Sequence, residues 1–99
     1  MSIEKNIVFA LKQVYDPEIP VNVYDLGLIY DIRVEVEKAM IKMTLTAPNC
    51  PMVDELLENV YDAVSMVPGV KDVAIELTFD PPWSRERMSE EALLELGLL

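Results

Sequence analysis

The chain has 99 residues, of which 52% are hydrophobic, and its formal net charge is -10, from 18 acidic and 8 basic side chains. This length and apolar content predict one folded domain, spanning residues 1–99, with a core between two packed layers. The acidic excess disfavours nucleic acid and anionic membranes as direct partners, because both are bound through Lys and Arg side chains that neutralise negative charge. It is typical of a soluble surface or of one that meets a basic protein.

The chain contains one cysteine and no histidine, which limits its chemistry. A single cysteine forms no internal disulfide, and without histidine there is no Ser-His or Cys-His pair and no His-ligated metal. The N-terminal sequence lacks the basic start and apolar run of a signal peptide, and no stretch approaches the ~18 apolar residues of a membrane span. We therefore expect a cytoplasmic protein that is not an enzyme.

Apolar spacing predicts three helices and three strands. They are a helix over 3–14, strands over 28–36 and 39–45, a helix over 51–65, a strand over 70–79 and a short helix capped by Ser89. Helices repeat apolar residues every three to four positions and strands every two. Because each strand has one apolar face, we expect an α/β fold of the two-layer α+β kind, in which helices cover a small mixed three-stranded sheet in the order α-β-β-α-β-α. The crossover through the second helix can place the third strand parallel to a hairpin strand.

The first two strands are expected to form an antiparallel hairpin with a tight connection around Glu37-Lys38. The alternation assigns Tyr30 and Val36 to the apolar face of the first strand, and Thr44 to the outward face of the second.

Three further features concern the turns and the C-terminal segment. Gly27 is expected to close a turn over 22–27. Trp83 follows two prolines and is expected to fasten the C-terminal segment to the domain rather than to bind a ligand. The apolar end, 92–99, either packs on the sheet or gives a partner a helical face, and we favour packing.

Cys50 is the main candidate for chemistry. It lies in a loop between a strand end and a helix start, where unpaired N–H groups favour the thiolate, which is both a nucleophile and a metal ligand. Asp54 and Glu55 oppose this effect by adding negative charge nearby. The alternative is that Cys50 is a small apolar residue filling a gap.

Carboxylates and hydroxyls form a second group of candidates. Asp16 and Glu18 flank a proline in a loop expected at one end of the sheet. They could bind a metal or a partner's basic group, or form an Asp turn with Glu18 in water. Thr44 and Thr46 could orient a ligand near the thiol, although threonine is ordinary on an outward strand face.

A resemblance to a known family rests on three segments: DPEIPVNVYDLGLIY at 16–30, TLTAPNCP at 44–51 and VAIELTFDPPW at 73–83. Together they resemble the SufT/PaaD-type family of iron–sulfur cluster assembly domains. The resemblance implies a compact α/β domain that helps to mature iron–sulfur proteins, with Cys50 of the Cys-Pro motif as the functional thiol. The residues expected to shape the site or to contact a partner are Asp16, Glu18, Asp25 and Thr46.

The number of thiols constrains how a cluster could be held. An iron–sulfur cluster is typically held by four thiolates, whereas this chain supplies one and lacks the extra C-terminal cysteines of PaaD-like proteins. A cluster would be shared across a homodimer, completed by other thiols, or held only transiently during transfer. The leading hypothesis is therefore an accessory factor for cluster assembly or delivery, acting through Cys50, whose partners are iron–sulfur assembly proteins and recipient apo-proteins. Rival hypotheses are a metal-free adaptor, a subunit of a PaaD-like ring-oxidising complex, and a thiol peroxidase or persulfide carrier.

Overall fold

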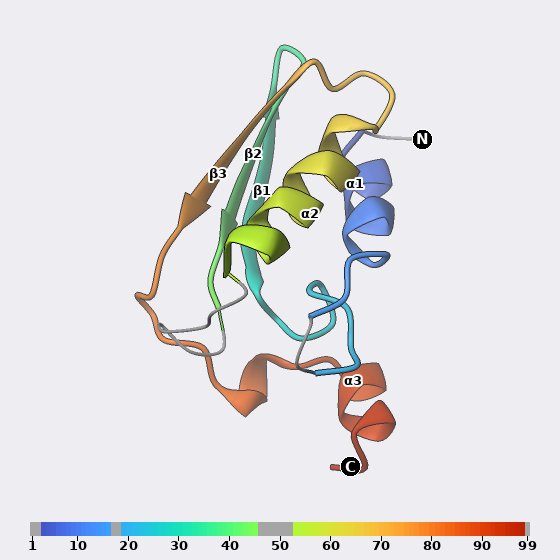
Figure 1. Cartoon of the computed structure of the whole chain (residues 1–99), viewed down its shortest axis with the longest axis vertical. Helices are drawn as coiled ribbons and strands as arrows, with labels where there is room; N and C mark the ends of the chain where they lie inside the picture. Colours follow the sequence, from blue (N-terminus) through green and yellow to red (C-terminus); the bar gives the residue numbers. More distant parts are fainter. Residues whose placement is uncertain (1–2, 17–18, 46–52, 99) are drawn as a thin grey trace.

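The computed structural model, which describes residues 3–16, 19–45 and 53–98, is a sheet with helices packed on one side (Figure 1). Its elements are α1 (Ile3–Leu11), β1 (Ile29–Glu35), β2 (Lys38–Met43), α2 (Val53–Ser65), β3 (Asp72–Leu77), a 3₁₀ turn (Arg85–Arg87) and α3 (Glu90–Glu95). The strand order is β1-β2-β3, and β2 pairs antiparallel with β1 and parallel with β3. The predicted element order and the parallel third strand are confirmed. Within the described part of the chain, no helix is long and apolar enough to cross a membrane.

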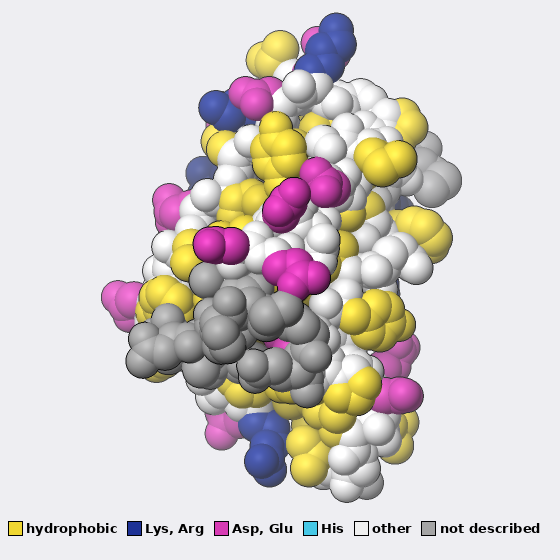
Figure 2. Space-filling view, viewed as in Figure 1, with side chains coloured by type: hydrophobic (Ala, Val, Ile, Leu, Met, Phe, Trp, Pro, Cys, Tyr) yellow, Lys and Arg dark blue, Asp and Glu magenta, His cyan; other side chains and the backbone are white. Residues whose placement is uncertain are grey.

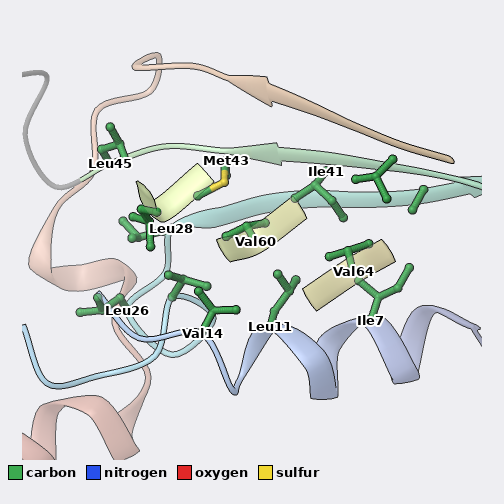
Figure 3. Close-up of a cluster of buried hydrophobic side chains, with 14 of the residues drawn as sticks. Ile7, Leu11, Val14, Leu26, Leu28, Ile41, Met43, Leu45, Val60 and Val64 are labelled. Carbon is green, nitrogen blue, oxygen red and sulfur yellow. The ribbon is translucent and has the colours of Figure 1, made fainter. Parts of the chain in front are cut away.

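The core lies between the sheet and the helices α1 and α2 (Figure 3). On α1, Ile7 and Leu11 are fully buried, and Val60 and Val64 of α2 are also fully buried. Both pairs are four residues apart, so each helix presents one apolar stripe to the sheet. They meet Ile41 of β2, which is 1% exposed on the central strand. Burial of these stripes fixes both helices on one face of the sheet.

The opposite face of the sheet is charged. Ion pairs there join Arg33 to Asp31, Lys38 to Asp72 and Lys42 to Glu76, with N–O distances of 2.9, 4.0 and 3.7 Å. These side chains are about half exposed or more, so each pair contributes little to stability. The polar half of the predicted alternation is therefore the solvent-facing side of the sheet.

The hairpin turn lies one residue earlier than predicted. Glu35 pairs with Lys38, which leaves Val36 and Glu37 as the two turn residues. Their φ angles are 54° and 87°, the left-handed values that a two-residue type I′ turn requires. The expectation that Val36 lies on the apolar face is wrong, because this side chain is 90% exposed. A period-two pattern cannot separate a strand residue from a turn residue when the turn residue is itself β-branched.

This turn leads to a stability prediction. Type I′ turns favour Asn-Gly, whereas a β-branched residue such as Val36 is strained at positive φ. Replacing Val36 with Asn and Glu37 with Gly should raise the free energy of unfolding by about 1–2 kcal/mol, minus a small loss from the exposed Lys71–Glu37 ion pair. Urea denaturation measures this change. A double variant less stable than the wild type would contradict the turn assignment.

Tyr30 also departs from the predicted alternation. The register shifts between Ile29 and Asp31, so that Ile29 pairs with Met43 while Asp31 pairs with Lys42. This β-bulge moves Ile29 onto the face that Tyr30 was expected to occupy. Tyr30 instead binds the C-terminal segment, as described below.

Candidate functional site

The segments that precede Cys50 in the sequence meet at the end of the sheet opposite the hairpin turn (Figure 1). A chain of backbone hydrogen bonds joins them. The Val23 N–H donates to the Val14 carbonyl at 2.8 Å, and the Leu28 N–H donates to the Val23 carbonyl at 3.1 Å. The Thr44 N–H donates to the Leu28 carbonyl at 2.8 Å. The end of α1, the turn over 22–27 and the end of β2 are therefore held in one backbone network. β2 leads directly into the connection that carries Cys50.

The turn over 22–27 is held by its own side chains. The Asn22 side chain accepts the Asp25 backbone N–H at 2.8 Å and donates to the Asp25 carboxylate at 2.7 Å. Gly27 closes the turn at φ 80°, as predicted. The role of Asn22 was not anticipated, although an Asn at the first position of such a turn is a recognised sequence signal.

The C-terminal segment is fastened to this turn and to β1. The indole N–H of Trp83 donates to the Leu26 carbonyl at 2.7 Å, which confirms the predicted fastening role of Trp83. The Tyr30 hydroxyl donates to the Pro81 carbonyl at 2.8 Å, and Ser89 N–H donates to the Asp25 carbonyl at 2.8 Å. Each segment of the family resemblance therefore contributes described residues to one end of the molecule, and in the second segment these are Thr44 and Leu45.

The apolar end of the chain is divided between packing and exposure. Ser89 caps α3 as predicted, with its hydroxyl accepting Ala92 N–H at 3.1 Å. Ala92 is buried, and Leu93 and Leu96 pack against the core. Leu94 is 62% exposed, so α3 both packs and leaves one apolar side chain in water.

Asp16 is a buried carboxylate at this end, with an exposed fraction of 8%. Its side chain accepts Ile19 N–H at 3.1 Å, and its own N–H donates to Val21 at 3.2 Å. Carboxylates that accept backbone N–H groups in this way hold a turn rigid. Across residues 3–16, 19–45 and 53–98, no group of three or more Cys, Asp or Glu side chains is placed to hold a metal ion.

Asp25 lies beside a small acidic hollow between the turn and α3. The hollow has a volume of about 210 Å³, and Asp25, Glu91 and Glu95 line it together with Asn22 and Tyr15. A basic group of a partner is the kind of group that these carboxylates could bind.

Thr44 is the most informative residue that the structure places at the site. It is fully buried, and its hydroxyl has no hydrogen-bond partner in the described structure. The expectation that Thr44 lies on a solvent-exposed strand face is therefore wrong. Met43 and Leu45 are buried as well, so both faces of the strand are covered where it ends. A buried hydroxyl without a partner costs about 1–3 kcal/mol, and this cost calls for a functional or structural explanation.

Three predicted site residues, Cys50, Thr46 and Glu18, lie outside the described residues. The ends of the connection that carries Cys50 are nevertheless known, since β2 ends at Met43 and α2 begins at Val53. The structure brings Asp16, Asp25 and Thr44 to the same end of the sheet.

Comparisons with known proteins agree with this architecture. The sequence profile described as "Iron-sulfur cluster assembly protein" matches residues 4–77. A protein of Porphyromonas gingivalis described as an Fe-S protein maturation auxiliary factor is 58% identical, over 97% of this chain and 92% of its own. The Bacillus subtilis auxiliary factor YitW is 38% identical over 98% and 96% of the two chains. A crystal structure of a domain of unknown function from Bacillus anthracis superposes with a TM-score of 0.90 at 37% identity, over 98% of this chain and 93% of that one. The chain belongs to the family of iron–sulfur cluster assembly proteins.

Proposed function

We propose that this protein is an accessory factor that helps to assemble or deliver iron–sulfur clusters to recipient apo-proteins in the cytoplasm, and that Cys50 is the group that holds the cluster. The observation that carries the proposal is the meeting of the three family segments at the end of the sheet from which β2 leads to Cys50. The names of the relatives, which describe maturation auxiliary factors, support the same role and favour a non-catalytic one.

The number of thiols suits a cluster that the protein releases. One chain supplies one thiol, whereas a cluster is typically held by four thiolates. Cys50 would therefore share the cluster with a second copy of the chain or with thiols from elsewhere, and would hold it only during transfer. The buried Thr44 hydroxyl is available to donate a hydrogen bond toward a ligand at the end of β2, and Asp16 and Asp25 keep the neighbouring turns in place.

Anaerobic reconstitution with iron and sulfide tests this assignment. The wild type should develop the broad visible absorption of a cluster, and Cys50→Ser should lose it, because serine does not replace the thiolate ligand. Metal content per chain and sedimentation of the loaded protein show whether two chains share the cluster. Equal absorption in the wild type and in Cys50→Ser would contradict a ligand role for this residue.

A metal-free adaptor is the second candidate, and the net charge of -10 favours it. An adaptor needs only surfaces that hold an assembly protein and a target, and it would bind cluster proteins equally well after Cys50→Ala. Failure of both the wild type and Cys50→Ser to form a chromophore would favour this second role.

A further inference from the structure

The two core helices leave an apolar groove on the outside of the molecule. Its volume is about 360 Å³, and its lining residues are Asn6, Phe9 and Ala10 of α1, Ala63 of α2, and Met66, Val67 and Pro68 after α2. Phe9 is 69% exposed and Met66 is 83% exposed. Large apolar side chains that flank an apolar groove are a known feature of protein-binding surfaces.

Carboxylates lie beside this groove along α2. At 100° per residue, Glu55, Glu58 and Asp62 lie on the side of α2 opposite its buried stripe, and Asp62 is four residues before Met66 of the groove. All of these side chains are exposed, and α2 contains no Lys or Arg. Figure 2 shows acidic side chains gathered over the position of α2, with hydrophobic side chains beside them. The groove is therefore apolar inside, and its rim on the α2 side is the exposed, negatively charged side of that helix.

These charges select among occupants. A second copy carries the same net charge of -10 and the same acidic α2, so two grooves placed face to face would bring carboxylates together. An anionic lipid surface is repelled for the same reason. A protein segment with apolar side chains flanked by Lys or Arg satisfies both the groove and its rim.

The walls also select the conformation of the occupant. The groove is lined by α1, α2 and the turn after α2, and no strand of the sheet lines it, so it offers no strand edge to an extended peptide. An extended segment buried there would lose water from its backbone N–H and C=O groups without gaining partners. A helix satisfies its own backbone and presents apolar side chains every three to four residues.

We propose that the α1–α2 groove is a docking site for a basic amphipathic helix of a protein partner. Phe9 and Met66 form its apolar contacts, and Glu55, Glu58 and Asp62 attract the basic side chains of the incoming helix. This deepens the proposed function by naming the surface that holds a partner, and it depends on neither Cys50 nor a cluster.

The test uses a synthetic amphipathic peptide of Leu and Lys as the probe. Fluorescence anisotropy should show binding that weakens with salt, because screening acts on the exposed carboxylates, and NMR shift changes should fall on α1 and α2. Phe9→Ser and Met66→Ser should each weaken binding roughly tenfold, and Glu55→Gln with Asp62→Asn should reduce the salt dependence. Leu94→Ser, which changes an exposed apolar residue on α3, is the matched control and should leave binding unchanged.

Several results would overturn the docking site. These are equal binding of a peptide with the same composition in scrambled order, equal binding of an analogue with Glu in place of Lys, and NMR shift changes on the charged face of the sheet. Self-association of the protein that Phe9→Ser abolishes would assign the groove to a second copy instead. Cys50→Ser should bind the peptide as tightly as the wild type, so failure of this proposal is separable from failure of the cluster role.

Discussion

Replacing Gly27 with Ala should destabilise the protein by roughly 3 kcal/mol or more and release the C-terminal segment. Gly27 has a φ of 80°, which costs an L-residue with a side chain about 1–2 kcal/mol. A Cβ atom there would also overlap the backbone carbonyl of Arg87, which packs directly on the glycine. Backbone atoms cannot move aside as the end of a flexible side chain can, so the added cost is large.

The free energy of unfolding, the Trp83 fluorescence and one matched variant separate the backbone strain at Gly27 from the clash with Arg87. Gly97→Ala introduces the same kind of strain at φ 72°, but nothing lies within 4 Å of its Cβ position, so it should cost only about 1–2 kcal/mol. Trp83, the only tryptophan, reports whether the C-terminal segment is docked, since its indole N–H donates a hydrogen bond to the Leu26 carbonyl. Its fluorescence should shift to the red in Gly27→Ala and stay unchanged in Gly97→Ala. Equal stability losses in the two variants would contradict the close approach of Arg87.

Replacing Thr44 with Val should make the protein more stable and less active in cluster-protein maturation. Valine has nearly the same shape and removes a buried hydroxyl that has no partner in the described structure. The free energy of unfolding should therefore rise by about 1 kcal/mol, or roughly 4 to 8 °C in melting temperature. If the hydroxyl donates to a ligand held near Cys50, maturation should fall in Thr44→Val and persist in Thr44→Ser.

Thr78→Val is the matched control for this prediction. The Thr78 hydroxyl donates to the Asp80 carbonyl and accepts the Asp80 N–H, both at 3.2 Å. Its removal breaks two hydrogen bonds, so this variant should be no more stable than the wild type. A stability loss in Thr44→Val would show that the hydroxyl is satisfied in the folded protein, and unchanged maturation would remove Thr44 from the site.

The sequence was informative where one local signal decided the structure. Apolar spacing predicted the two core helices and the three strands, Gly27 predicted the turn over 22–27, and Ser89 predicted the cap of α3, all of which are confirmed. The crossover through the second helix predicted a third strand parallel to a hairpin strand, and β3 pairs parallel with β2. Each of these features depends on residues that are close together in the chain or on a general rule of chain topology.

The errors arose where distant contacts or bulges decide the outcome. A bulge at Ile29 moved Tyr30 off the apolar face, and alternation alone gives no sign of a bulge. Thr44 is polar and stands in the outward register of the alternation, yet both faces of the strand are covered where it ends. α1 ends at Leu11 rather than at 14, and Val14 is buried in the turn that follows. The motifs of the candidate site could be recognised in the sequence, whereas the burial of Asp16 and Thr44 could not.

Complementation in cells that lack the native factor tests the central claim most directly. The activity of a cluster-dependent enzyme is measured after expression of the wild type, Cys50→Ser or Leu94→Ser, at equal protein levels. The wild type and Leu94→Ser should restore the enzyme, and Cys50→Ser should not, because the thiol is the proposed cluster ligand. Full restoration by Cys50→Ser would contradict a role of this protein through Cys50.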